Sequence, residues 1–445
     1  MLSAPHRTKS PQSPNSQSPN SPSPQPSQPR GTFSSLRIRN VRLFASGNFV
    51  SYTGTWVQRI AQDWLVLSLT GSATAVGVTT ALQFLPTLLF GLAGGLIADR
   101  YPKRRILLAT QVAASSMGAV LAYLTLSHQV QPWHVYVIAF GLGLVTAVDN
   151  PARQSFVTEL VEPDQLRNAI SINSSVFQLA ALIGPAISGV LIGAVGSGYA
   201  FAANAISYVA PVIALLLIHD NELVRLPRTG ARKLQLSDGF RYVASRPHML
   251  WPTVLVGVFG MFTMNLPVTL AAYAKTVFHS GPSGYGLLSS IVAIGSLAGA
   301  LVSARRSRTT LRGLAGICLV LAALEMLTAA APEQWSYCLL AAVGAATLLF
   351  VTSANSMVQL AAAESIRGRV MGVYLLVFFG GGALGGPIVG AIDQHLGPRM
   401  GMLLAGAVPA AATVLIALKL AHDGQLRVQV RPRGPWSRVV AVVPR

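Results

Sequence analysis

Three ionisable side chains lie inside long apolar stretches of this chain, where a charge is costly to bury. Arg59 and Asp63 are four residues apart, so on a helix they share one face and are able to pair. Glu325 lies in a separate apolar stretch. A carboxyl group inside a membrane-spanning helix is a candidate proton carrier, so we predict proton coupling at Arg59, Asp63 and Glu325. A structural pair near a membrane interface and, for Glu325, a place at the bundle edge remain alternatives.

Uncharged polar side chains in the same stretches form a second group of candidates. Buried amide side chains either hydrogen-bond a small molecule or join neighbouring helices, and both interpretations stay open for each of them. The candidate substrate contacts are Asn48, Gln58, Gln83, Gln178 and Asn265.

The elements that must position these side chains are long apolar helices. Of the 445 residues 52% are hydrophobic and 11% charged, whereas a soluble domain carries about 25% charged residues. A helix that crosses a bilayer needs about 20 apolar residues. The apolar runs centre near Tyr52, Leu88, Ala114, Gly141, Phe177, Ser207, Phe259, Val292, Leu321, Val343, Phe379 and Val408. We therefore predict an all-α integral membrane protein of twelve transmembrane helices in two pseudo-symmetric six-helix halves.

The positions of Lys and Arg predict the orientation of these helices. The chain has 33 such residues and a net charge of +19, and they cluster in every second connection. The exceptions are Arg59, Lys275 and Arg399. Cytoplasmic loops carry the excess of Lys and Arg, so both termini are expected in the cytoplasm and the chain in the plasma membrane. The same distribution argues against a nucleic-acid partner.

Changes of composition divide the chain into five parts. Residues 1–37 are rich in Ser, Pro, Gln and Asn and predict a disordered cytoplasmic tail. Between the halves, Leu236, Phe240 and Val243 are spaced as on an interfacial amphipathic helix, although a solvated linker is the alternative. The remaining parts are a six-helix bundle at 38–219, a cytoplasmic linker at 220–249, a second bundle at 250–421 and a basic cytoplasmic tail at 422–445.

The two halves repeat one another at an offset near 204. We align Gly95 with Gly299, Asn150 with Asn355, and the Gly-Pro pair at 184–185 with that at 386–387. Parallel repeats about an axis along the membrane normal characterise one class of transporter.

The segment from Gly95 to Arg105 carries the most specific local motif. An acid, Asp99, stands between a glycine and a basic cluster that includes Arg100, Lys103 and Arg104. Glycine permits close helix packing, and a carboxylate at the membrane edge is stabilised by a helix N-terminus. The segment resembles the cytoplasmic loop signature of the major facilitator superfamily, with Pro102 in place of a glycine. The resemblance implies a latch that stabilises one alternating conformation; a generic positive-inside loop is the other interpretation.

A Gly-Pro motif occurs once in each half. Gly184, Pro185 and Gly189 follow Ala180 in the first half, and Gly386 and Pro387 follow Gly382 in the second. Small residues allow close helix contact, and proline kinks a helix. Both copies resemble the antiporter motif of the same superfamily, which implies a hinge during exchange; ordinary glycine packing remains an alternative.

Two further segments narrow the resemblance. The run 149–160, which begins Asp-Asn-Pro-Ala-Arg-Gln, and the run 64–72, Trp-Leu-Val-Leu-Ser-Leu-Thr-Gly-Ser, are similar to the enterobactin exporter and related transmembrane secretion effectors. The resemblance covers most of 39–420. It implies proton-coupled export of an amphipathic small molecule, such as a drug-like compound, secondary metabolite or siderophore, across a lipid bilayer. We expect a monomer with no cofactor.

Other functional classes find little support in the sequence. No phosphate-binding loop of the G-x-x-x-x-G-K-[ST] type is present, and the two cysteines, Cys318 and Cys338, form no metal or disulfide pattern. We predict neither catalytic residues nor a metal site. Uptake of a small metabolite remains the alternative within transport, and a membrane enzyme or a non-transporting receptor the alternative outside it.

Overall fold

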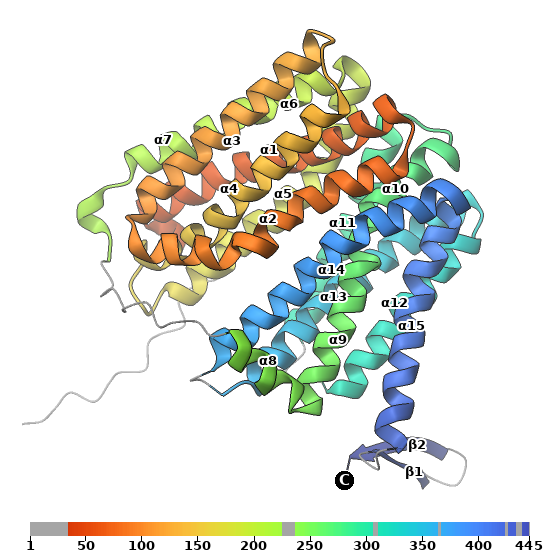
Figure 1. Cartoon of the computed structure of the whole chain (residues 1–445). Helices are drawn as coiled ribbons and strands as arrows, with labels where there is room; N and C mark the ends of the chain where they lie inside the picture. The colour runs from red at the N-terminus through yellow and green to blue at the C-terminus, as the bar shows by residue number, and fades with distance from the viewer. Residues whose placement is uncertain are drawn as a thin grey trace, which may run out of the picture.

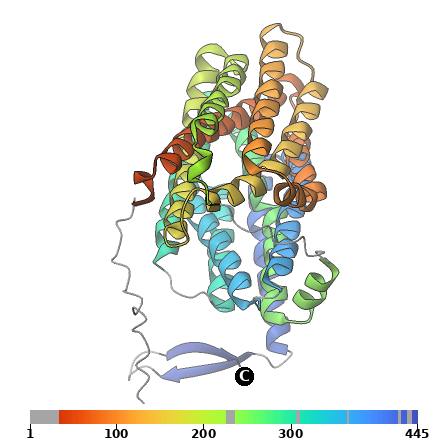
Figure 2. The ribbon, with the colours of Figure 1, turned by 90° about the vertical axis from the view of Figure 1, so that its left-hand side faces the viewer.

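The computed structural model describes residues 34–224, 236–305, 310–363, 366–422, 426–432 and 438–444. The described part is almost entirely helical and forms two bundles. Figures 1 and 2 show the N-terminal bundle, coloured red to yellow-green, above the C-terminal bundle, coloured green to blue.

Each bundle contains six membrane-length segments. The N-terminal bundle consists of α1 (Arg39–Thr70), α2 (Ala73–Arg100), α3 (Lys103–Leu126), α4 (Pro132–Glu159), α5 (Leu166–Val195), α6 (Ser197–Ser207) and α7 (Val209–Leu217). The C-terminal bundle consists of α9 (Pro247–Met261), α10 (Leu266–Thr276), α11 (Pro282–Ala304), α12 (Leu311–Ala330), α13 (Glu333–Ala361), α14 (Arg367–Leu396) and α15 (Pro398–His422). Helices α6 and α7 form one segment, and α9 and α10 form another around a short 3₁₀ turn, Thr263–Asn265.

Eleven of these segments are long and apolar enough to cross a membrane. The twelfth is α1, which has 32 residues but a more polar sequence. Its polar side chains face the bundle interior, since Asn48, Gln58 and Asp63 are all buried. The prediction of twelve helices in two halves is confirmed.

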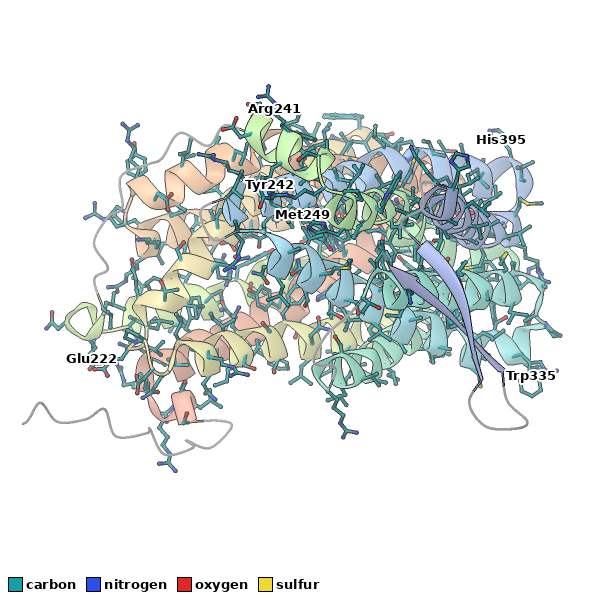
Figure 3. All side chains as sticks on the ribbon, turned by 90° about the horizontal axis from the view of Figure 1, so that it is seen from below. Glu222, Arg241, Tyr242, Met249, Trp335 and His395 are labelled. Atoms are coloured by element: carbon teal, nitrogen blue, oxygen red, sulfur yellow. The ribbon has the colours of Figure 1, made fainter. Side chains whose placement is uncertain are left out.

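The turns between helices lie at two ends of the molecule. We call the end that carries Arg39, Arg100 and Arg246 the basic end, and the other the far end. At the far end three turns use glycines with positive φ: Gly71, Gly196 and Gly397. Gly71 closes α1 by donating its N–H to Leu67, and Ser72 then caps α2. Figure 3 shows Glu222 at the basic end, and Trp335 and His395 at the far end.

The connection between the bundles contains the helix expected there, α8 (Leu236–Ala244). It lies beside α9 and α14 at the basic end (Figure 1). Val243 is buried, whereas Phe240 is 44% exposed, and Asp238 forms an ion pair with Arg369 of α14 at 3.3 Å. Helix α9 begins at Pro247, before the predicted boundary at 250.

Two short elements modify the predicted tails. Ser34–Arg37 form a 3₁₀ helix, and Ser35 is buried against α5, where its N–H donates to Asn168 Oδ1 at 3.1 Å. The tail was predicted to extend to residue 37, but Ser34–Arg37 form a helical turn, because the buried N–H of Ser35 has a hydrogen-bond acceptor on α5. Residues 1–33 lie outside the described residues. After α15, β1 (Leu426–Pro432) pairs antiparallel with β2 (Arg438–Pro444), with Leu426 opposite Pro444.

Candidate functional site

The halves meet at the far end through two pairs of glycines. A Cβ on Gly77 of α2 would lie 2.0 Å from the carbonyl oxygen of Gly386 on α14. A Cβ on Gly286 of α11 would lie 2.6 Å from Cα of Gly189 on α5. Neither position accommodates a side chain, so backbone packs directly on backbone. Both predicted Gly-Pro motifs therefore lie on this interface.

The same face of α2 is separated from the C-terminal half toward the basic end. Gly77 is packed tightly; about three turns later, Leu88 lies 3.4 Å from an added Cβ on Gly380; about two turns after that, an added Cβ on Gly95 would meet nothing within 4 Å. Asp99, one turn further, is exposed and has no hydrogen bond or ion pair among the described residues. The two halves are thus closed at the far end and open at the basic end.

The basic residues of the predicted latch contact their own half instead. Lys103 pairs with Glu159 of α4 at 2.7 Å, and Arg104 donates to the carbonyl of Leu216 in α7 at 3.0 Å. The glycine that packs closely here is Gly94, not the predicted Gly95, because a Cβ on Gly94 would lie 2.1 Å from the carbonyl oxygen of Ala147. A Cβ on Gly299 of α11, 205 residues after Gly94, would likewise lie 2.2 Å from a backbone carbonyl oxygen, that of Ala345.

Among the described residues, one hydrogen bond between two buried side chains crosses the closed end. Tyr285 of α11 donates its hydroxyl to Asp63 Oδ2 of α1 at 3.0 Å, and both residues are buried. The ring of Tyr285 stacks on Trp64, with centroids 6.4 Å apart. Oδ1 of Asp63 has no hydrogen-bond partner. Tyr285 lies within an apolar run of the other half, and no local pattern in the sequence connects it with Asp63.

Arg59 does not form the predicted ion pair with Asp63 but has partners of its own. Its Nε donates to Gln83 Oε1 at 3.1 Å. The guanidinium lies 5.5 Å from the ring centroid of Trp56 and 5.4 Å from that of Phe84. Phe84 in turn stacks on Phe379 of α14, so this cluster joins the halves near the middle of α2 and α14. Of the amide candidates, Gln83 thus accepts a hydrogen bond from a charged side chain, Arg59, that faces the other half.

A buried charged network in the N-terminal half was not predicted as such. Arg153 donates to Asp149 Oδ2 from Nε at 2.8 Å, and Asp149 Oδ1 accepts from Thr110 and Gln111 at 2.7 and 2.9 Å. Arg153 also hydrogen-bonds Asn48. The positive-inside pattern suggested a loop position for Arg153, but it lies inside α4 and is 5% exposed. Its i, i+4 spacing from Asp149 was the signal available in the sequence.

Most of the other amide candidates serve their own half. Asn48 is buried in this network, and Gln58 is buried beside Asn204, to which it is hydrogen-bonded. Asn265 donates to the carbonyl of Met261 at 3.1 Å, beside the break between α9 and α10. Gln178 is half-buried on α5. Asn48 and Gln58 thus join helices of the N-terminal half, whereas Asn265 bonds the backbone of its own segment.

The buried acids of the C-terminal half have few partners. Glu325 of α12 is fully buried; its Oε2 accepts from Thr263 at 3.5 Å, and its Oε1 has no partner. Asp393 of α14 is 4% exposed, and neither carboxyl oxygen has a hydrogen-bond partner among the described residues. Within the described residues no cluster of His, Cys, Asp and Glu is arranged to hold a metal ion.

Comparison with protein families identifies the family of this chain. A family model described as transmembrane secretion effector matches residues 30–438. The chain belongs to this family. The resemblance predicted from the motifs is therefore confirmed.

Three curated relatives illustrate the range of similarity. The chain is 29% identical over 266 residues to the staphyloferrin A transporter of Staphylococcus aureus, which covers 59% of this chain and 66% of the relative. It is 24% identical to macrolide efflux protein A of Streptococcus pyogenes, over 58% of this chain and 64% of the relative. In both cases the match spans slightly less than two thirds of the relative. The multidrug efflux pump Tap of Mycobacterium tuberculosis is 25% identical over 85% of this chain and 92% of its own length.

Solved structures share the fold of this transmembrane secretion effector. A bacterial homologue of the human lysosomal transporter Spinster, in an inward-facing and unoccupied conformation, aligns with a TM-score of 0.68 over 89% of this chain and 99% of its own, at 15% identity. A POT family transporter in complex with a thioalcohol-conjugated peptide aligns with a TM-score of 0.70 over 88% and 99%, also at 15% identity. The predicted major facilitator fold is confirmed, and the family is one of transporters rather than enzymes.

Proposed function

We propose that this chain is a secondary active transporter that exports an amphipathic small molecule by alternating access, in exchange for protons. One observation carries the proposal: the two halves are joined by glycine contacts at the far end and stand apart at the basic end. Such an arrangement is one of the two states that alternating access requires.

The direction and location of transport follow from the charges and the relatives. The basic end corresponds to the cytoplasm by the positive-inside rule, so the described state faces inward, with both termini in the cytoplasm of a plasma-membrane protein. The named efflux relatives support export, and the Gly-Pro motifs at the inter-half contacts agree with it. We take the functional unit to be a monomer, because each half completes the interface of the other.

Asp63 is the proposed proton carrier. In the inward-facing state its carboxyl group is enclosed by the closed far end and bonded to Tyr285. Opening of the far end separates α1 from α11, breaks this bond and exposes the carboxyl group to the outside, from which protons enter. The latch is proposed to act in that other state, in which Gly95 and Asp99 approach the C-terminal half.

The test uses inside-out proteoliposomes with a panel of amphipathic dyes and drugs. Export appears there as accumulation in the lumen, and an acidic lumen should drive it until a protonophore abolishes the gradient. Asp63→Asn keeps an acceptor for Tyr285 but removes the titratable group, so proton-driven accumulation should fall more than tenfold while downhill exchange continues. Tyr285→Phe keeps the acid and removes the bond.

Three outcomes would contradict parts of this proposal. Accumulation only in right-side-out vesicles would mean uptake. Wild-type flux that ignores the proton gradient would remove the coupling ion proposed here. Full proton-driven accumulation by Asp63→Asn would assign coupling to another group. Asp99→Asn serves as the matched exposed acid: it should leave proton dependence intact and change only the balance between states.

A further inference from the structure

The guanidinium group of Arg59 lies between the two halves and is held in position by its neighbours. Its Nε is held by Gln83, and its guanidinium carbon lies 5.5 Å from the ring centroid of Trp56 and 5.4 Å from that of Phe84. The side chain is half-buried rather than sealed in the core. Because three neighbours fix its position, little conformational entropy is lost when a ligand binds to it.

The binding face of this guanidinium is unused. Among the described residues, its two terminal amino groups have no hydrogen-bond acceptor and Arg59 forms no ion pair within 4 Å, although its charge interacts at longer range with that of Asp63. Asp63, one turn further along α1, is bonded to Tyr285 instead. The planar fork of an arginine fits the two oxygens of a carboxylate, or of another oxyanion, through two parallel hydrogen bonds. Lysine lacks this geometry.

The surroundings of the fork are aromatic. Phe84 stacks on Phe379 with centroids 5.9 Å apart, and Phe177 lies 6.1 Å from Trp56 and 5.3 Å from Tyr52. A ligand with its charged group on Arg59 would thus place an apolar or aromatic body against these rings. A positively charged ligand would meet the guanidinium with like charge.

We propose that the cargo is an amphipathic organic anion whose oxyanion group binds the guanidinium of Arg59 and whose apolar body lies against Phe84, Trp56 and Phe379. This inference rests on the proposed export function and names its substrate class. The phosphate of an anionic lipid offers the same chemistry, so the test must separate a soluble anion from a lipid headgroup.

The experiment compares two probes with the same body and opposite charge, 2-naphthoate and 2-naphthylmethylammonium. Binding to the full chain in a neutral maltoside detergent is followed by tryptophan fluorescence, with Trp56→Phe identifying the local signal. The variants are Arg59→Gln and Arg59→Lys. Arg246→Gln is the matched control, because Arg246 also lies over an aromatic ring, that of Tyr242 at 3.6 Å, but it precedes α9 at the basic end. Figure 3 shows Tyr242 at that end, near Met249.

The expected result is preferential binding of naphthoate by the wild type. Arg59→Gln should weaken naphthoate at least about tenfold, Arg59→Lys should weaken it less, and Arg246→Gln should leave it unchanged. A melting curve for each variant confirms that it is folded. Naphthoate that fails to bind, binds no better than the ammonium, or binds equally to Arg59→Gln overturns the proposal.

A second arm adds phosphatidylglycerol to the detergent. Competition by the lipid at low molar ratio, with naphthoate displaced fully, would assign the site to a headgroup and overturn a soluble cargo. Retained naphthoate binding supports it. Neither arm measures flux, so the two proposals can fail separately. If the protein binds naphthoate selectively but does not export, the proposed function fails and this inference stands.

Discussion

The two halves share their backbone packing but differ in their buried charges. Gly94 meets Ala147 in the first half as Gly299 meets Ala345 in the second. Asp149 and Arg153 form a buried ion pair on α4, whereas the positions 205 residues later on α13 are Ala354 and Val358, both fully buried. In the sequence alignment that pairs Asn150 with Asn355, the ion pair of the first half thus corresponds to two apolar residues in the second.

This difference separates what the fold requires from what function requires. Buried ion pairs are often no more stable than apolar residues of similar volume. Since Ala354 and Val358 pack α13 without charges, the fold itself does not demand Asp149 and Arg153. We infer that the N-terminal half carries the ionic chemistry, with Asp63 and Arg59 added at the interface, and that the C-terminal half supplies a largely apolar partner.

The largest effect is expected from breaking the ion pair on one side only. Arg153→Val leaves the Asp149 carboxylate buried without its cation and should cost about 3–5 kcal/mol of unfolding free energy. The double variant Asp149→Ala/Arg153→Val copies the C-terminal half and should recover most of that loss. Unfolding in mixed micelles measures both. A double variant as unstable as the single one would show that the ions are needed for the fold.

The next effect concerns the glycine contact. Gly77→Ala places a Cβ against the Gly386 carbonyl, and overpacking of this kind costs about 1–3 kcal/mol, so the far end should open. Spin labels at Leu69 and Leu396, both exposed near the far end, should move apart in double electron–electron resonance, with Cys318 and Cys338 replaced beforehand. Gly95→Ala is the matched control, because it meets no atom in this state. If the distance does not change in Gly77→Ala, the contact between Gly77 and Gly386 does not keep the far end closed.

Features that depend on neighbouring residues in the chain could be predicted from the sequence, whereas contacts between distant segments could not. Helix number, the linker helix and the Gly-Pro motifs follow from local patterns and were predicted, whereas the orientation in the membrane stays a prediction. Contacts between distant segments were not predicted: Tyr285 and Asp63 are 222 residues apart, and an apolar run hides the tyrosine. Arg153 was placed in a loop, because a charge near a helix end looks like a topology signal until its partner is seen. Gly94 and Gly95 are indistinguishable until the facing helix is known.

A smaller effect should follow from removing the bond across the halves. Tyr285→Phe deletes one hydroxyl that donates to a buried acid and should cost about 1 kcal/mol of the closed far end. Tyr273→Phe is the matched control: this tyrosine is also buried in the C-terminal half, but its hydroxyl has no partner among the described residues. The distance between spin labels at Leu69 and Leu396 reports the outcome. Equal responses of the two variants would mean that Asp63 does not hold the halves together.

The smallest effect is expected at Glu325, and it tests the division of labour between the halves. Glu325→Gln keeps the shape of the side chain and an acceptor for Thr263, and no cation among the described residues is left unpaired, so the loss of stability should stay below about 1 kcal/mol. Proton-driven accumulation in vesicles should survive, in contrast to Asp63→Asn. A stable Glu325→Gln protein that still exchanges substrate but no longer responds to the gradient would place a coupling proton in the C-terminal half. The apolar character of that half would then be incomplete, and Glu325, enclosed beside the helix break at Thr263, would join Asp63 as a second carrier.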